Sequence, residues 1–166
     1  MRNIIAFPLL ALTVILQSSI ISQIKLLSGY ADLMMIILSA WALQKRVRSS
    51  WHWAILGCTM LGFISKMPWP VIFVSYLMVV FVAHILQRRV WQAPLLAMFS
   101  VTLIGTLILH LMSFGSLRIL GTPFLFSEVM GAVTLPSLLL NMFFSIPIYA
   151  FMRELARWVY PLEEHE

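Results

Sequence analysis

Long runs without a charged side chain constrain the fold of this chain more than any other feature. Five such runs occupy residues 4–24, 33–43, 71–86, 95–111 and 135–152. A helix of roughly 20 apolar residues crosses the hydrocarbon core of a bilayer. Only 10% of the residues are charged and 61% are hydrophobic, whereas soluble domains are about one quarter charged. The sequence therefore predicts an all-α integral membrane protein, folded as one transmembrane domain over residues 1–166.

We expect six membrane spans in a helical bundle. Their predicted boundaries are 4–24, 31–44, 51–66, 70–87, 93–113 and 128–152. The second and third spans are short for a bilayer of about 30 Å, so they must tilt or extend into flanking residues. Residues 51–87 form either two full spans or one helical hairpin. No small-x-small cleavage pattern follows the first run, which favours a retained helix over a signal peptide.

The basic residues indicate an orientation. With six spans and an internal N-terminus, eight basic residues lie inside and three outside, as the positive-inside rule requires. The inside set is Arg2, Lys45, Arg46, Arg48, Arg88, Arg89, Arg153 and Arg157, and the outside set is Lys25, Lys66 and Arg118. Both termini are therefore expected in the cytoplasm. The thin spread of these charges argues against a nucleic-acid partner.

Tryptophan residues follow the same boundaries. All six fall near predicted span ends, where indole rings prefer the membrane interface. They are Trp41, Trp51, Trp53, Trp69, Trp91 and Trp158.

Polar and small residues recur every fourth position in several spans, and such residues share one helix face. Three stripes are present: Ser137, Asn141, Ser145 and Tyr149; Thr102, Thr106 and His110; and the small-residue ridge Ala54, Cys58 and Gly62. Small and polar faces mediate helix packing in membranes. We therefore predict that Asn141 is buried and hydrogen-bonded between helices, as structural glue or as part of a partner or ligand site. Gln17 and Asp32 complete the candidate packing and interaction residues.

The arrangement of reactive residues is poor for catalysis. Between Asp32 and Glu128 there is no acidic residue, so a carboxylate pair for acid–base chemistry would need these two positions. His84 and His110 are expected near opposite membrane surfaces and cannot share a metal ion. No phosphate-binding glycine loop or zinc-ligand spacing occurs. We expect no enzymatic activity, catalytic residue, metal or cofactor.

Four short motifs resemble the MreD family of bacterial rod shape-determining proteins. They are LQSSI at 16–20, ADLMMIILSAWAL at 31–43, LGF at 61–63 and LPSLLLN at 135–141, the last followed by a proline and a basic end. The resemblance covers nearly the whole chain in size and span layout. Ala31 stands where the family has proline, and Lys66 and Pro68 occupy the region where an acidic residue commonly follows the third span.

The resemblance implies a non-enzymatic scaffold in the bacterial inner membrane. Such a scaffold acts in cell-wall elongation and peptidoglycan synthesis, and it binds MreC, a partner with one membrane helix and a periplasmic domain. Other members of the elongation complex are further candidate partners. The family fold is similar to the six-helix substrate-binding subunits of vitamin (ECF) transporters. We expect the partner helix to lie against one of these packing faces, either the ridge that includes Gly62 or a polar stripe, and the partner's periplasmic part to contact residues 113–127.

Two other functions remain open from the sequence. A small-molecule-binding subunit of a transporter would need polar groups at the outer helix ends. Gln17, Gln23, Asp32, His110 and Glu128 are the residues available for such a site. An accessory subunit of a respiratory or photosynthetic complex would suit the eleven methionines and the apolar faces.

Overall fold

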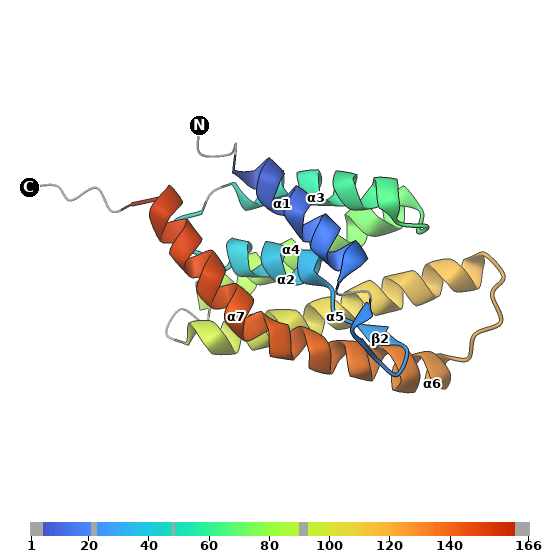
Figure 1. The fold of residues 1–166 in the computed structure, drawn as a ribbon. Coiled ribbons are helices and arrows are strands. Elements are labelled where there is room, and N and C mark those ends of the chain that lie inside the picture. Colours follow the sequence, from blue (N-terminus) through green and yellow to red (C-terminus); the bar gives the residue numbers. More distant parts are fainter. Residues whose placement is uncertain (1–4, 21–22, 48, 90–92, 162–166) are drawn as a thin grey trace, which may run out of the picture.

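The computed structural model describes residues 5–20, 23–47, 49–89 and 93–161. This part of the chain is almost entirely helical (Figure 1). The helices are α1 (Ala6–Ser19), α2 (Leu33–Ala42), α3 (Ser50–Ile64), α4 (Trp69–Arg89), α5 (Pro94–Ile119), α6 (Phe126–Val129) and α7 (Leu135–Val159). A π-helical turn, η2 (Met130–Thr134), joins α6 to α7. The expectation of a helical protein is confirmed.

Three helical segments are long and apolar enough to cross a membrane. They are Trp69–Arg89, Pro94–Ile119 and the continuous segment Phe126–Val159. The helices α1, α2 and α3 have 14, 10 and 15 residues. A helix rises 1.5 Å per residue, so α2 is only about 15 Å long. The structure thus supports a membrane protein, and the crossing of all six segments stays a prediction.

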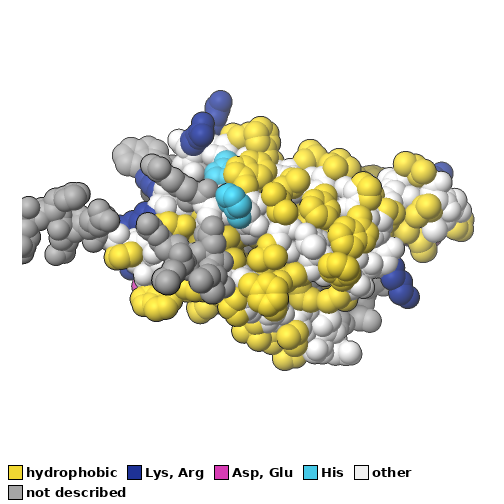
Figure 2. Space-filling model, turned by 90° about the horizontal axis from the view of Figure 1, so that it is seen from above, with side chains coloured by type: hydrophobic (Ala, Val, Ile, Leu, Met, Phe, Trp, Pro, Cys, Tyr) yellow, Lys and Arg dark blue, Asp and Glu magenta, His cyan; other side chains and the backbone are white. Residues whose placement is uncertain are grey.

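Part of the predicted topology falls on positions outside the described residues. These are Arg2, Arg48, Trp91, the side chain of Lys25 and residues 162–166. On the face seen in Figure 2, hydrophobic side chains are widely spread and Lys and Arg lie toward the two ends. This distribution matches a bundle with an apolar middle and polar ends.

The short helix α2 lies at the centre of the bundle. Nine of its ten residues are buried, and α1, α3, α4, α5 and α7 all pack against it. A helix that is apolar on all sides is stable only where other helices surround it. In Figure 1 the longer α5 and α7 run side by side, and these two helices are in contact.

Two tryptophans occupy the core rather than the membrane interface. Trp41 and Trp53 are fully buried, and their rings stack with centroids 4.2 Å apart. The interfacial interpretation is wrong for these two, because they fill the space between the C-terminal part of α2 and the start of α3. Trp51, Trp69 and Trp158 are exposed.

A small antiparallel hairpin precedes α2 and was not predicted. It pairs β1 (Lys25–Leu26) with β2 (Gly29–Tyr30), and Leu27 adopts a positive φ of 54°. The hairpin packs on η2, where Ser28 N–H donates to the carbonyl of Ala132 at 3.1 Å. That carbonyl lies four residues before Pro136, which has no N–H to donate to it. Pro136 thus accounts for the π-helical turn. It also explains why the carbonyl of Ala132 is free to accept the hydrogen bond from the hairpin.

Candidate functional site

The N-terminus of α2 is the centre of a polar cluster. Asp32 caps the helix, with its Oδ1 accepting from the Met35 N–H at 3.0 Å. A capping carboxylate satisfies an N–H that has no partner within the helix. The other oxygen, Oδ2, accepts from the Tyr76 hydroxyl at 2.6 Å. Asp32 therefore ties the start of α2 to α4.

Asn141 ties the same point to two further helices. Its Oδ1 accepts from the Asp32 N–H at 2.7 Å, and its Nδ2 donates to Thr106 Oγ1 at 2.9 Å. Thr106 in turn donates to the carbonyl of Thr102 at 2.7 Å. Asn141 is 1% exposed. The prediction that this amide is buried and hydrogen-bonded between helices is confirmed, and its partners are the backbone before α2 and the side chain of Thr106.

Two more side chains from distant segments complete the cluster. Gln17 Oε1 accepts from the Met34 N–H at 3.0 Å, and Ser137 Oγ accepts from the Tyr30 N–H at 3.0 Å. The first N–H groups of a helix have no intrahelical acceptor. Here Gln17 of α1 and Asp32 supply acceptors to α2, and Asn141 and Ser137 of α7 supply acceptors to the backbone just before it. A short helix that begins inside the bundle is thereby stabilised.

A cavity of about 280 Å³ opens beside this cluster. Its polar lining includes Gln17, Tyr30, Asp32, Tyr76, Thr106, His110 and Asn141. Its apolar lining includes Leu61, Ile64, Ile72 and Leu109. Ligand sites in proteins are typically about 300–1,000 Å³, mostly apolar, with a few placed polar groups. The cavity is just below that range and has the same kind of lining.

The charge of the lining restricts what the cavity could hold. Among the described residues that line it, Asp32 is the one charged side chain. His110 has its Nδ1 2.9 Å from Thr134 Oγ1, so one ring nitrogen is already engaged. A neutral or cationic polar molecule suits this lining better than an anion does.

The structure brings together only some of the predicted residues. Gln17, Asp32, Thr106, His110 and Asn141 line the cavity. Ser137 of α7 contacts the hairpin through the Tyr30 N–H. Thr102 is buried one turn before Thr106, and Ser145 and Tyr149 are buried further along α7. Gln23 and Glu128 are exposed and do not join the cluster.

Tyr30, Tyr76 and Thr134 are not among the candidate residues predicted from the sequence. Tyr76 stands out there as a polar residue two turns from His84 in the fourth predicted span, but nothing in that pattern predicts its contact with Asp32. The roles of Tyr30 and Thr134 depend on the hairpin and on η2, for which no pattern was recognised.

The small-residue ridge faces the interior. Ala54 and Cys58 are 0% exposed, and a Cβ on Gly62 would lie 3.0 Å from the ring of Trp69. The ridge therefore permits close packing inside this chain. Of the faces that were candidates for a partner helix, the ridge is not available, because the chain's own residues already cover it.

Among the described residues, no group of three or more His, Cys, Asp and Glu is placed to hold a metal ion. Comparison with protein-family models, curated proteins and solved structures gave no match to this chain. The description of the class of protein therefore rests on the sequence and the structure: a helical protein with at least three helices suited to a membrane.

Proposed function

We propose that this chain is a non-enzymatic scaffold of the bacterial cell-wall elongation machinery. It sits in the inner membrane with both termini in the cytoplasm and binds a single-span MreC-like partner. The motif resemblance over most of the chain supports the assignment. A scaffold acts by binding, so the proposal requires a surface that the chain itself leaves uncovered.

The observation that carries the proposal is an outer apolar patch at the end of α5. It consists of the exposed side chains Ile119, Leu120, Phe124, Leu125 and Phe126. Ile119 is 88% exposed. Clustered exposed apolar residues mark protein–protein or membrane contacts. The patch falls within residues 113–127, the segment expected to touch the partner.

The patch is held in a defined shape. Arg118 donates to the carbonyl of Phe124 at 3.1 Å, and Thr122 Oγ1 donates to the carbonyl of Leu117 at 2.7 Å. Beside it, an apolar groove of about 410 Å³ is lined by Phe114, Leu117, Phe124, Val129 and Val133, among others. A preformed apolar surface loses little conformational freedom on binding, which favours a stable complex.

Site-specific photo-crosslinking tests this proposal. A photoreactive amino acid at Leu120 or Phe124 should crosslink to a co-expressed single-span partner. The matched control is Phe143, an equally apolar side chain that is 71% exposed on the middle of α7. Crosslinks to lipid alone from Leu120 and Phe124 would contradict the outer apolar patch as the docking surface.

The polar cavity favours a second candidate, a small-molecule-binding subunit of a transporter. Its lining comes from α1, α3, α4, α5 and α7 and from Tyr30 and Asp32 just before α2. Native mass spectrometry of the purified chain tests this function directly. A bound small molecule that is lost on Gln17→Leu and retained on Leu139→Ala would support it.

A further inference from the structure

We propose that the end of the bundle opposite the outer apolar patch carries a binding site for one anionic phospholipid. The site combines a basic pocket for the headgroup with an adjoining apolar groove for an acyl chain. It is independent of the scaffold proposal, because it uses different residues at the other end of the helices.

The headgroup pocket lies where α2, α4, α5 and α7 end or begin. Its volume is about 230 Å³. Four basic side chains line it: Lys45, Arg46, Arg153 and Arg157. Gln44 and Gln87 add polar groups, and Tyr149 forms part of the wall. Basic pockets between membrane helices bind phosphate-containing lipid headgroups.

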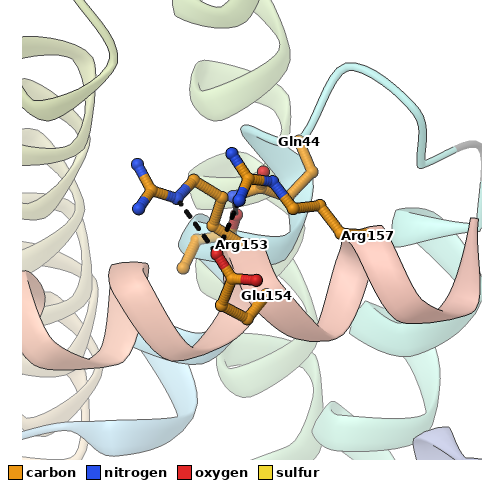
Figure 3. A network of polar contacts seen from close by, with 5 residues as sticks. Gln44, Arg153, Glu154 and Arg157 are labelled. Carbon is orange, nitrogen blue, oxygen red and sulfur yellow. Dashed lines mark hydrogen bonds and ion pairs between the residues drawn. The ribbon is translucent and has the colours of Figure 1, made fainter. Parts of the chain in front are cut away.

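In the part of the chain that the structure describes, the carboxylate of Glu154 faces these cations. Glu154 Oε1 lies 2.8 Å from Arg157 Nη1 and 4.0 Å from Arg153 Nε. Figure 3 shows the carboxylate between the two guanidinium groups, with Gln44, two residues after the end of α2, beside them. Glu154 is largely exposed, and exposed ion pairs contribute little. Among the described residues, the four basic side chains outnumber this carboxylate, so that part of the pocket has a net positive charge that complements a phosphate.

An apolar groove continues from the pocket along the outer surface of α5 and α7. It has a volume of about 420 Å³ and is lined by Ala93, Pro94, Leu95, Leu96, Ile146 and Ala150. Pro94, Tyr149 and Arg153 line both the pocket and the groove. A cationic pocket that opens directly into an apolar groove complements a phospholipid, which joins an anionic phosphate to an acyl chain.

The probe is phosphatidylglycerol, with phosphatidylcholine as the zwitterionic control, added to the delipidated full-length protein in native mass spectrometry. The wild type should retain one phosphatidylglycerol in preference to phosphatidylcholine. Each basic side chain near an anionic headgroup contributes roughly fivefold in affinity, so Arg153→Gln with Arg157→Gln should weaken binding about 25-fold. Arg153→Lys with Arg157→Lys should restore most of it.

Matched controls separate this site from general charge and apolar effects. Lys66→Gln with Arg118→Gln removes two charges at the other end and should leave binding unchanged. Ala150→Trp should fill the groove and weaken retention, whereas Leu139→Trp, on another part of the α7 surface, should not.

Three results would overturn the proposal. The first is an equal loss of binding in both double Gln variants. The second is displacement by inorganic phosphate at concentrations equal to those of the lipid, which would indicate a simple anion site. The third is equal displacement by a polyglutamate peptide, which would indicate an acidic protein partner.

Discussion

At the residue scale, Asn141 makes two contacts that no aliphatic side chain can replace. Asn141→Leu removes the acceptor for the Asp32 N–H and the donor to Thr106. Leaving buried polar groups without partners costs about 1–3 kcal/mol. We expect a lower unfolding temperature in detergent. Leu139→Ala, at a side chain 60% exposed on the same helix, should have a smaller effect, and equal effects would mean that the amide is incidental.

Gly29 is the second residue for which the structure allows little change. An added Cβ would lie 2.6 Å from the backbone N of Ser137 and 2.8 Å from the carbonyl oxygen of Val133. Because both neighbours are backbone atoms, Gly29→Ala must displace the hairpin from α7. Overpacking of this kind costs roughly 1–3 kcal/mol. Gly115→Ala, where a Cβ meets nothing within 4 Å, is the control in the same thermal unfolding measurement. Equal stability of the two variants would show that the hairpin adjusts freely.

Tyr76 is the third residue for which the structure allows little change, because of its hydroxyl group. Tyr76→Phe removes the donor to Asp32 Oδ2 and keeps the ring. A hydrogen bond to a carboxylate contributes about 1.5–3 kcal/mol, so the variant should unfold at a lower temperature than the wild type. Tyr160→Phe, at the opposite end of the bundle, removes a hydroxyl that bonds the Ser49 hydroxyl at 3.1 Å rather than a carboxylate, and it should lower the unfolding temperature less. If Tyr76→Phe unfolded at the wild-type temperature, the hydrogen bond between Tyr76 and Asp32 would not contribute to the stability of α2.

At the element scale, the junction of η2 and α7 depends on Pro136. In Pro136→Ala a new N–H becomes available to the carbonyl of Ala132 and competes with Ser28. We predict faster amide exchange in residues 26–30, measured by hydrogen–deuterium exchange. Pro147→Ala, at the exposed proline inside α7, should leave that exchange unchanged. Unaltered exchange in the Pro136 variant would contradict the role assigned to the proline.

The sequence predicted the elements better than their lengths. Charge-free runs located α4, α5 and α7, because apolar length is a direct requirement of a bilayer. The same criterion predicted a longer α2 than the structure shows. The start of α2 is set by contacts from Gln17 and Asn141, which are far away in the sequence. The four-residue stripes correctly indicated inward faces, but periodicity does not reveal which helix each face meets. Tyr76 was therefore missed as the partner of Asp32, and Trp41 was assigned to the interface.

At the scale of the whole molecule, the excess of basic residues on the predicted inner side predicts that both termini lie in the cytoplasm. Alkaline phosphatase fused after residue 166 should be inactive, and green fluorescent protein at the same position should fluoresce. A fusion after Lys66, expected outside, should give the opposite pair of signals. A periplasmic signal from either terminus would contradict the six-span arrangement.

The central claim is that this chain acts by binding a single-span protein partner. Purification of the wild-type chain from its native membrane in mild detergent tests it most directly, with mass spectrometry of every co-eluting species. We predict a stable complex with a single-span membrane protein that has a periplasmic domain. A monodisperse monomer carrying a tightly bound small molecule, with no protein partner, would contradict the scaffold and favour the transporter subunit.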